Sequence, residues 1–244
     1  MTRSPRYVDV PGPAGPIRAC VSAPAGDGPF PAVLFYSDIF QLTGPHLRLA
    51  ARLADRGYLV LAPEIYGRLE PGGTVLDFER DRQRALSDAS RVRVEEVDGD
   101  RRALIAWLTA RSDVDPAGLF VAGFCFGGHL AFRAAYEPRV ARVACFYPTT
   151  VHAETLGASE RVDTLARAAA LHAPLLLVWG ARDPHIPPEG RAKIHAALDA
   201  AGARYETATF DAEHAFMRDE GPRHDPAATD AAFERMIAFF GRSG

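Results

Sequence analysis

The sequence has few cysteines, no long apolar run and no excess of either charge. Its 244 residues include only three cysteines, an odd number spread far apart, which argues against a disulfide framework. No apolar run approaches the roughly 18–20 residues that a membrane span requires. A count of 28 basic against 31 acidic residues leaves a net charge of −3. Because nucleic acids and anionic membranes favour a basic stripe, neither is expected as a partner.

Signatures of cofactors, metals and export are missing as well. The chain contains no G-x-G-x-x-G dinucleotide fingerprint, no Walker-type G-K-[ST] and no H-E-x-x-H or C-x₂-C spacing, so we expect neither a cofactor nor a metal. The first residues, MTRSPRYVDVPGP, lack the apolar stretch of a secretory signal, and we expect a cytoplasmic protein. Without an internal repeat or a linker, residues 1–244 are expected to form a single domain.

Short apolar segments alternate with helical patterns along the whole chain. Strands are expected at 16–24, 31–37, 58–63, 119–123, 140–147, 175–180 and 205–210. Apolar residues at helical spacing predict helices near 44–56, 97–108, 127–136, 194–201 and 233–240. This alternation predicts an α/β fold with a mainly parallel central sheet and helices on both faces. Residues 67–92 are polar and interrupted by glycine, and they are expected to form a surface excursion near the pocket, either a binding loop or a solvated helix pair.

A tight turn with a central cysteine follows one of the predicted strands. The segment Gly123-Phe124-Cys125-Phe126-Gly127 has the form G-x-C-x-G, and the G-x-S-x-G version of this pattern is the nucleophile elbow of α/β-hydrolases. A thiol at a helix N-terminus is favoured to ionise, and the Phe126 N–H lies where it could bind an oxyanion. The alternative is a buried structural cysteine. Cys20 and Cys145 lie inside strand patterns without flanking glycines and are expected in the core.

Two further turns supply a carboxylate and an imidazole in the chain order that this fold uses. Asp183 follows the strand ending at 180, and His214 follows the strand ending at 210. The carboxyl ends of parallel strands meet at one edge of the sheet, so Cys125, Asp183 and His214 are predicted to form a catalytic triad. Taken singly, Asp183 could cap a turn before a proline and His214 could be a polar loop residue.

The turn after the strand at 31–37 is expected to complete the oxyanion site. Its Ile39 N–H is the candidate for a second oxyanion donor. Asp38 would then be a carboxylate beside the thiol, and a nearby negative charge raises the pKa of a thiol. The alternative for Asp38 is an ordinary turn residue.

Together these residues resemble the dienelactone hydrolase family, also called carboxymethylenebutenolidases, over roughly 33–240. The matching segments are DIF at 38–40, APEIYGR at 62–68, RQR at 82–84, GFCFGG at 123–128, RDP at 182–184 and HAFMR at 214–218. The resemblance implies a Cys-His-Asp triad at Cys125, His214 and Asp183, and hydrolysis of a carboxylated enol-lactone through a thioester. It also implies that Arg84 and Arg218 bind the substrate carboxylate, which suits the bidentate geometry of a guanidinium.

The sequence departs from the family pattern around the substrate. The family has Glu at the position of Asp38, where it keeps the resting thiol protonated, and aromatic residues are expected at the positions of Asp88 and Arg91. We therefore predict a hydrolase of a lactone or small carboxylic ester, with a dienelactone-like compound as one candidate, acting as a monomer or homodimer. The alternatives are a carboxylesterase, thioesterase or peptidase-like enzyme on the same scaffold, and a ligand-binding protein without catalysis.

Overall fold

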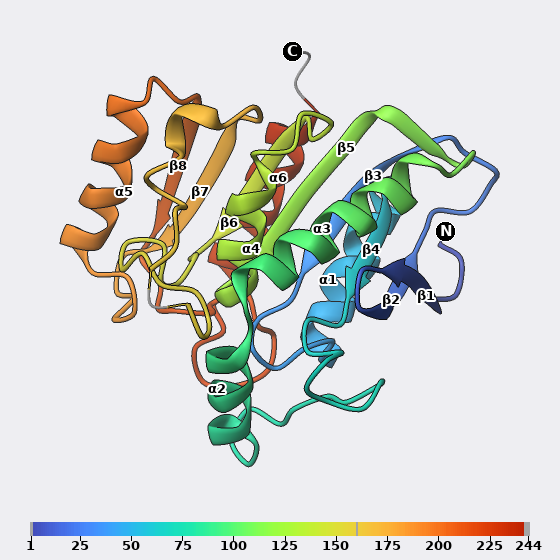
Figure 1. Ribbon diagram of the computed structural model, residues 1–244, viewed down its shortest axis with the longest axis horizontal. Helices are drawn as coiled ribbons and strands as arrows, with labels where there is room; N and C mark the ends of the chain where they lie inside the picture. Colours follow the sequence, from blue (N-terminus) through green and yellow to red (C-terminus); the bar gives the residue numbers. More distant parts are fainter. Residues whose placement is uncertain (1, 160, 242–244) are drawn as a thin grey trace.

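The computed structural model describes residues 2–159 and 161–241, and within these residues it has a central eight-stranded sheet (Figure 1). The order of the strands across the sheet is β1-β2-β4-β3-β5-β6-β7-β8. Their bounds are β1 (Arg6–Gly12), β2 (Gly15–Ser22), β3 (Phe30–Tyr36), β4 (Leu59–Pro63), β5 (Val114–Phe124), β6 (Arg142–Phe146), β7 (Leu175–Gly180) and β8 (Tyr205–Phe210). β1 and β2 are antiparallel to their neighbours, and the strands from β3 to β8 are parallel. The expected mainly parallel α/β sheet is confirmed.

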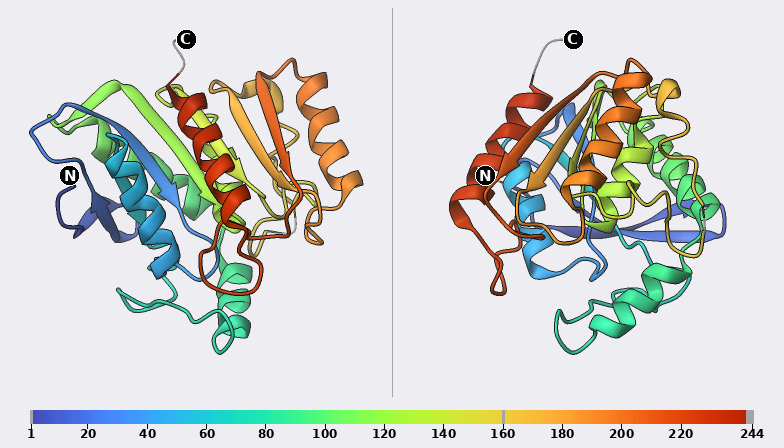
Figure 2. Two further views of the ribbon diagram at one scale, coloured as in Figure 1. Left: turned by 180° about the vertical axis from the view of Figure 1, so that it is seen from behind. Right: turned by 90° about the vertical axis from the view of Figure 1, so that its left-hand side faces the viewer.

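Helices cover both faces of this sheet. They are α1 (Gly44–Asp55), α2 (Arg82–Arg91), α3 (Val94–Thr109), α4 (Phe126–Ala134), α5 (Pro188–Ala200) and α6 (Pro226–Phe240), with a short 3-10 turn at Ala168–Ala170. α1 and α6 pack on one face and α3 and α4 on the other, as the front and back views show (Figures 1 and 2). This layering buries the apolar runs of the central strands from both sides.

The strand predictions were most accurate where a strand is buried on both faces. β7 and β8 have the predicted bounds, and every residue of β3 from Ala32 to Tyr36 is buried. β1 was not singled out, because its sequence RYVDVPG lies at the edge of the sheet and is mostly exposed. β5 begins five residues earlier than the expected 119, at Val114, because its first residues carry too few apolar side chains to signal a strand.

The polar excursion contains one helix and lies beyond the carboxyl ends of the parallel strands. α2 and the irregular segment before it project away from the sheet at the lower edge of Figure 1, and the side view in Figure 2 shows the same separation. The segment is anchored rather than loosely solvated, since Leu76 and Ala85 are fully buried and the Leu76 N–H donates to the Phe40 carbonyl at 3.2 Å. It is therefore held against the edge of the sheet at which α/β proteins bind ligands.

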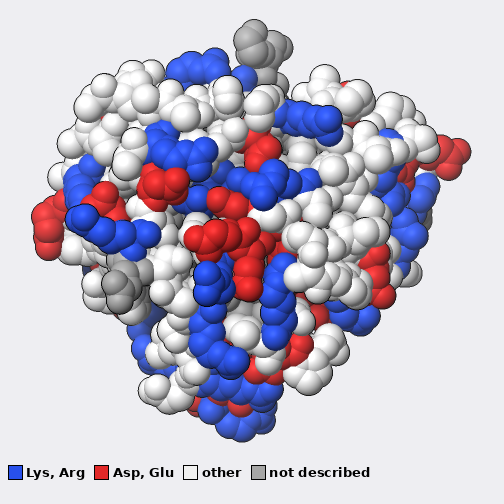
Figure 3. Space-filling view, in the orientation of Figure 1, with Lys and Arg blue, Asp and Glu red and all other residues white. Residues whose placement is uncertain are grey.

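Charges of both signs are interspersed over the surface shown in Figure 3. Exposed charges also form ion pairs, such as Arg48 with Asp219 and Arg56 with Glu234. Within residues 2–159 and 161–241, no helix has both the length and the apolar content to cross a membrane.

Candidate active site

The turn between β5 and α4 holds Cys125 in a strained backbone conformation. Cys125 has φ 55° and ψ −119°, a left-handed φ that residues other than glycine rarely adopt. The glycines on either side are required by space: a Cβ on Gly123 would lie 2.1 Å from the Gly127 carbonyl oxygen, and one on Gly127 would lie 2.1 Å from the Ser37 carbonyl oxygen. Strain of this kind persists only where the surroundings enforce it, and it is concentrated at functional sites.

Hydrogen bonds to neighbouring segments fix the position of Cys125. Its N–H donates to the Phe146 carbonyl at 3.0 Å, and its carbonyl accepts from the Thr149 N–H at 3.2 Å. The thiol lies 3.9 Å from the Thr149 hydroxyl, and the residue is only half-buried, so reagents can reach it. Phe126 begins α4, where an N–H has no acceptor within the helix and is free to bind a ligand. Cys20 and Cys145 are buried in the core, as expected.

Asp183 and His214 form a buried hydrogen-bonded pair at the ends of β7 and β8. The His214 Nδ1–H donates to Asp183 Oδ2 at 2.7 Å, and the other carboxylate oxygen accepts from the His185 N–H at 2.8 Å. Both residues are about 95% buried. Burial opposes ionisation of Asp183, but the hydrogen bond and charge of His214 together with the N–H and charge of His185 outweigh it, and the pKa of Asp183 lies below its ordinary value.

The His214 imidazole also interacts with the thiol. Burial disfavours the protonated ring, but the charge of Cys125, hydrogen bonds with Asp183 and Cys125, and the charge of Asp183 more than compensate, raising the pKa of His214 to about 9. The structure therefore brings Cys125, Asp183 and His214 together in the predicted order.

The turn after β3 is shaped by its own carboxylate. Asp38 Oδ1 accepts from the Phe40 N–H at 2.9 Å, and the next residue, Gln41, is fully buried with φ 69°. The Gln41 side chain accepts from the Tyr66 N–H at 3.2 Å and donates to the Thr74 carbonyl at 3.1 Å. These contacts fix the turn that carries Ile39, the predicted second oxyanion donor, and tie it to the excursion.

Asp38 does not stand free beside the thiol, because it is paired with Arg218. Arg218 Nη2 donates to Asp38 Oδ2 at 2.9 Å, and the guanidinium lies 4.0 Å from the centre of the Phe78 ring and 5.0 Å from that of Phe40. Burial raises the pKa of Tyr147, and the charges of Asp38 and Cys125 raise it further, so these two groups border the same space. The structure thus places Asp38 and Arg218 next to the triad as one ion pair.

Arg84 has a different position. It lies on α2 with half of its side chain exposed. Its guanidinium donates two hydrogen bonds to the Glu70 carboxylate, and the one from Nε is 2.7 Å long. Both arginines that were predicted to bind a substrate carboxylate are therefore already bound to carboxylates of the protein itself.

Several residues around the triad were missed by sequence reasoning. Tyr147, which directly follows β6, has φ 37°, and its buried ring packs edge-on against His214 with 5.0 Å between ring centres. His185 is exposed, but its ring centre lies 4.7 Å from that of His214. A search for polar side chains at the ends of strands, which led to His214, would also have found Tyr147.

Among the described residues, no cluster of three or more His, Cys, Asp or Glu side chains could hold a metal ion.

Taken together, the mainly parallel sheet, the strained turn into α4 and the pair at the ends of β7 and β8 define an α/β-hydrolase fold. Comparisons with known proteins narrow this class to a family. The family model described as "Dienelactone hydrolase family" matches residues 17–244.

Two relatives and one solved structure agree with this match. The chain is 33% identical over 222 residues to a "Putative carboxymethylenebutenolidase" of Saccharomyces cerevisiae, with 87% of this chain and 80% of the yeast protein covered. A protein of the same description from Escherichia coli K12 is 32% identical over 222 residues, covering 89% of this chain and 79% of its own length. The crystal structure of a "Putative Dienelactone Hydrolase from Klebsiella pneumoniae" superposes with a TM-score of 0.88 at 27% identity, covering 100% of both chains. The chain belongs to the dienelactone hydrolase family, and the predicted resemblance is confirmed.

Proposed function

We propose that this family member is a cysteine hydrolase that cleaves a lactone or a small carboxylic ester through Cys125, His214 and Asp183. The observation that carries the proposal is the buried His214–Asp183 hydrogen bond of 2.7 Å, next to a partly buried cysteine in a strained strand-to-helix turn. A nucleophile, a base and a group that orients the base are the parts that covalent hydrolysis requires.

The first half of the proposed reaction forms a thioester. The Cys125 thiolate attacks the carbonyl carbon, and the carbonyl oxygen becomes an oxyanion that accepts hydrogen bonds from the Phe126 and Ile39 N–H groups. When this intermediate collapses, the bond to the alcohol oxygen breaks and that oxygen takes the proton of the His214 imidazolium. The acyl group is left on sulfur, and His214 is left neutral.

The second half returns the enzyme to its starting state. Neutral His214 takes a proton from water as the water oxygen attacks the thioester carbonyl carbon. Collapse of the second intermediate breaks the carbon–sulfur bond and releases the acid and the thiolate, with His214 again protonated. Asp183 holds the Nδ1–H throughout, so that the opposite ring nitrogen faces the thiol.

The charges around the site favour an ester whose reacting part is uncharged. Arg218 is neutralised by Asp38 and Arg84 by Glu70, so a substrate carboxylate would have to displace a carboxylate of the chain from either arginine. A neutral lactone or ester can bind without opening either ion pair, so its binding costs less free energy.

The test is hydrolysis of p-nitrophenyl acetate and of a neutral enol-lactone by the wild type, Cys125→Ala and His214→Ala. Each substitution is expected to lower kcat/KM by at least about 10³-fold, because triad members act as a unit. Cys20→Ala is the matched control, since that cysteine is buried on β2 away from the turn, and its rates should match those of the wild type.

A chemical test separates an enzyme from a binding protein that merely keeps the pocket. Iodoacetamide near neutral pH is expected to alkylate Cys125 in preference to Cys20 and Cys145, and the loss of activity should track the alkylation of Cys125. Undiminished rates in Cys125→Ala, or full activity after complete alkylation of Cys125, would refute the proposal.

A further inference from the structure

Two buried polar atoms lie without partners between the thiol and α2. They are the hydroxyl of Tyr66 and the Oδ2 atom of Asp88, in residues that are 1% and 3% exposed. Neither atom has a hydrogen-bond partner among the residues that the structure describes. Because a buried donor or acceptor is costly when it is left unsatisfied, each such atom needs a reason, and a bound ligand is one.

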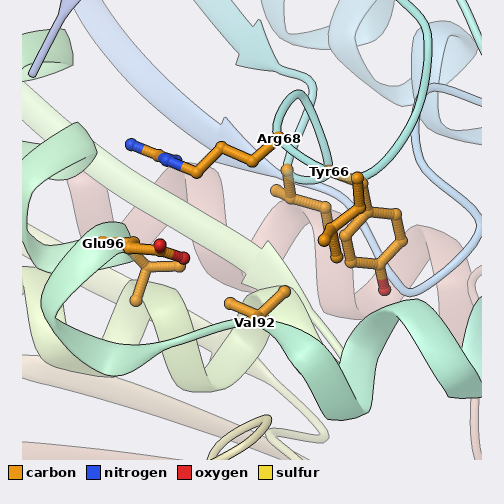
Figure 4. Close-up of a pocket in the computed structure, with 7 residues that line it drawn as sticks. Tyr66, Arg68, Val92 and Glu96 are labelled. Atoms are coloured by element: carbon orange, nitrogen blue, oxygen red, sulfur yellow. The ribbon is translucent and has the colours of Figure 1, made fainter. Parts of the chain in front are cut away.

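Tyr66 is held rigidly with its hydroxyl directed at α2. Its N–H donates to Gln41 Oε1, and its carbonyl accepts from the N–H groups of Leu69 and Glu70, both at 2.8 Å. Figure 4 shows Tyr66 at the border of the small hollow beside α3, with its hydroxyl pointing away from Arg68 and toward α2. A fixed hydroxyl in this direction is preorganised for a group that enters between the sheet edge and α2.

Asp88 faces inward from α2 as part of a carboxyl pair. Its carboxyl group is a neighbour of that of Glu70, which holds Arg84, and the two carboxyl groups influence each other's pKa. On the outer side, Arg91 Nη1 lies 3.7 Å from Asp88 Oδ1. The side chains of the two arginines are 51% and 58% exposed, and those of the two carboxyl groups are 6% and 4% exposed. The guanidinium groups therefore face solvent, and the carboxyl groups face the interior.

The electrostatics connect these two residues with the reacting thiol. The pKa of Tyr66 is raised by burial and by the charges of Cys125, Asp38 and Asp88, so its hydroxyl stays protonated and remains a donor close to all three. Burial and the neighbouring Glu70 raise the pKa of Asp88, which favours one proton shared between the two carboxyl groups. The wall formed by Tyr66 and Asp88 thus combines a donor with an acceptor and has no free positive charge.

We propose that Tyr66 and Asp88 form a subsite for a hydroxyl group on an uncharged substrate. The Tyr66 hydroxyl donates to the oxygen of that group, and the group donates its own proton to Asp88 Oδ2, so both unpartnered atoms are satisfied at once. A substrate carboxylate is disfavoured there, because it would add a third carboxyl group beside Glu70 and Asp88 and has no proton to donate. This inference rests on the proposed function, because it concerns the ester cleaved at Cys125.

Two matched series of esters test the subsite from either end of the substrate. The acyl series consists of the p-nitrophenyl esters of butyric acid, 3-hydroxybutyric acid and succinic acid (the monoester). The alcohol series consists of the acetate esters of p-ethylphenol, p-(hydroxymethyl)phenol and p-carboxyphenol. Spontaneous hydrolysis is subtracted in each case. In at least one series the wild type is expected to show a kcat/KM about tenfold higher for the hydroxylated ester than for its alkyl counterpart, with the carboxylated ester the poorest.

The variants are Tyr66→Phe and Asp88→Ala, which remove the donor and the acceptor, and the double variant. Each single variant should reduce the tenfold preference to about twofold or less while still hydrolysing the alkyl ester. If Asp88→Ala does not fold, Asp88→Leu replaces it, because leucine has a similar shape and no acceptor. Tyr58→Phe is the control, because its ring packs against Phe120 and Phe240 in the core, and it should keep the wild-type preference.

The outcomes separate the two proposals. If the alkyl esters are cleaved in a Cys125-dependent way but neither series shows a hydroxyl preference, the subsite is refuted and the proposed function stands. A hydroxyl preference that survives in Tyr66→Phe and Asp88→Ala would also refute the subsite. Hydrolysis that is independent of Cys125 would refute the proposed function itself.

Discussion

Two of the buried histidines, His129 and His214, are driven to opposite charge states by their surroundings. His129, on α4, is 0% exposed, with ring nitrogens 3.1 Å from the Thr150 hydroxyl and 2.8 Å from the Thr164 hydroxyl. Burial and the charge of Arg133 lower the pKa of His129 to about 3, whereas the pKa of His214 is raised to about 9. Burial alone therefore does not decide the state of an imidazole; its partners do.

The difference explains which histidine is poised for chemistry. Both nitrogens of His129 are bound to neutral hydroxyls, so its ring can neither take up nor pass on a proton without breaking the network. His214 has a carboxylate on one nitrogen and interacts with a thiol, and a substrate can replace the thiol as a proton partner. His129 helps to hold the segment after β6, whose Thr149 lies against Cys125.

Replacing each histidine in turn should separate catalysis from stability, and the loss of activity at His214 is the largest effect that we expect. His214→Gln is predicted to lower kcat/KM by about 10⁴-fold. His129→Ala is predicted to destabilise the protein by about 2–4 kcal/mol, because it opens a cavity in the core and removes the hydrogen bonds to Thr150 and Thr164, while the folded enzyme keeps activity within about tenfold. Urea unfolding and steady-state hydrolysis measure both quantities, and a stable but inactive His129→Ala would break the distinction.

Titration of His129 and of His214 should change the free energy of unfolding with pH in opposite directions. The pKa of His129 in the folded state lies below the ordinary value of 6.5, so its contribution is complete above pH 6.5 and is lost as the pH falls toward 3. The pKa of His214 lies above 6.5, so its contribution is complete below pH 6.5 and is lost as the pH rises through about 9. Each contribution is of the order of a few kcal/mol.

Unfolding free energies of the wild type and variants across this pH range test the assignment. Cys125→Ala should flatten the alkaline loss, because the thiolate is a main cause of the raised pKa of His214, and it should leave the acid side unchanged. An alkaline loss that persists undiminished in both Cys125→Ala and His214→Gln would assign that titration to another group.

Removing the cation beside Asp38 should have the smallest effect. Arg218→Gln leaves the Asp38 carboxylate without its ion-pair partner near the thiol, and we expect about a tenfold loss of kcat/KM on neutral and carboxylated esters alike. If Arg218 instead binds a substrate carboxylate, the loss will be confined to carboxylated esters. The same ester series therefore distinguishes the two roles.

The fold could be predicted from the sequence where the pattern is local. The apolar runs of β3, β4 and β7 are buried on both faces, and the order of Cys125, Asp183 and His214 follows from the rule that ligands bind at strand ends. β1 and α2 gave weak signals because they are partly exposed and polar.

The pairing of charges could not be predicted, because it depends on tertiary structure. Arg218 and Asp38 are 180 residues apart, and Arg84 meets Glu70 only because the excursion folds back on itself. Both arginines carried a sequence signal for binding a carboxylate, but nothing local could show that carboxylates of the chain itself already occupy them. His129 likewise gave no signal, since its two hydroxyl partners lie 21 and 35 residues further along the chain.

The most direct measurement of the central claim is the mass of the enzyme during turnover. The wild type or His214→Gln, quenched in acid during reaction with p-nitrophenyl acetate, should carry one acetyl group, and peptide mapping should place it on Cys125 as a thioester that hydroxylamine removes. Under the same conditions Cys125→Ala should carry none. An acetyl group mapped to another residue, or wild-type turnover by Cys125→Ala, would contradict the account.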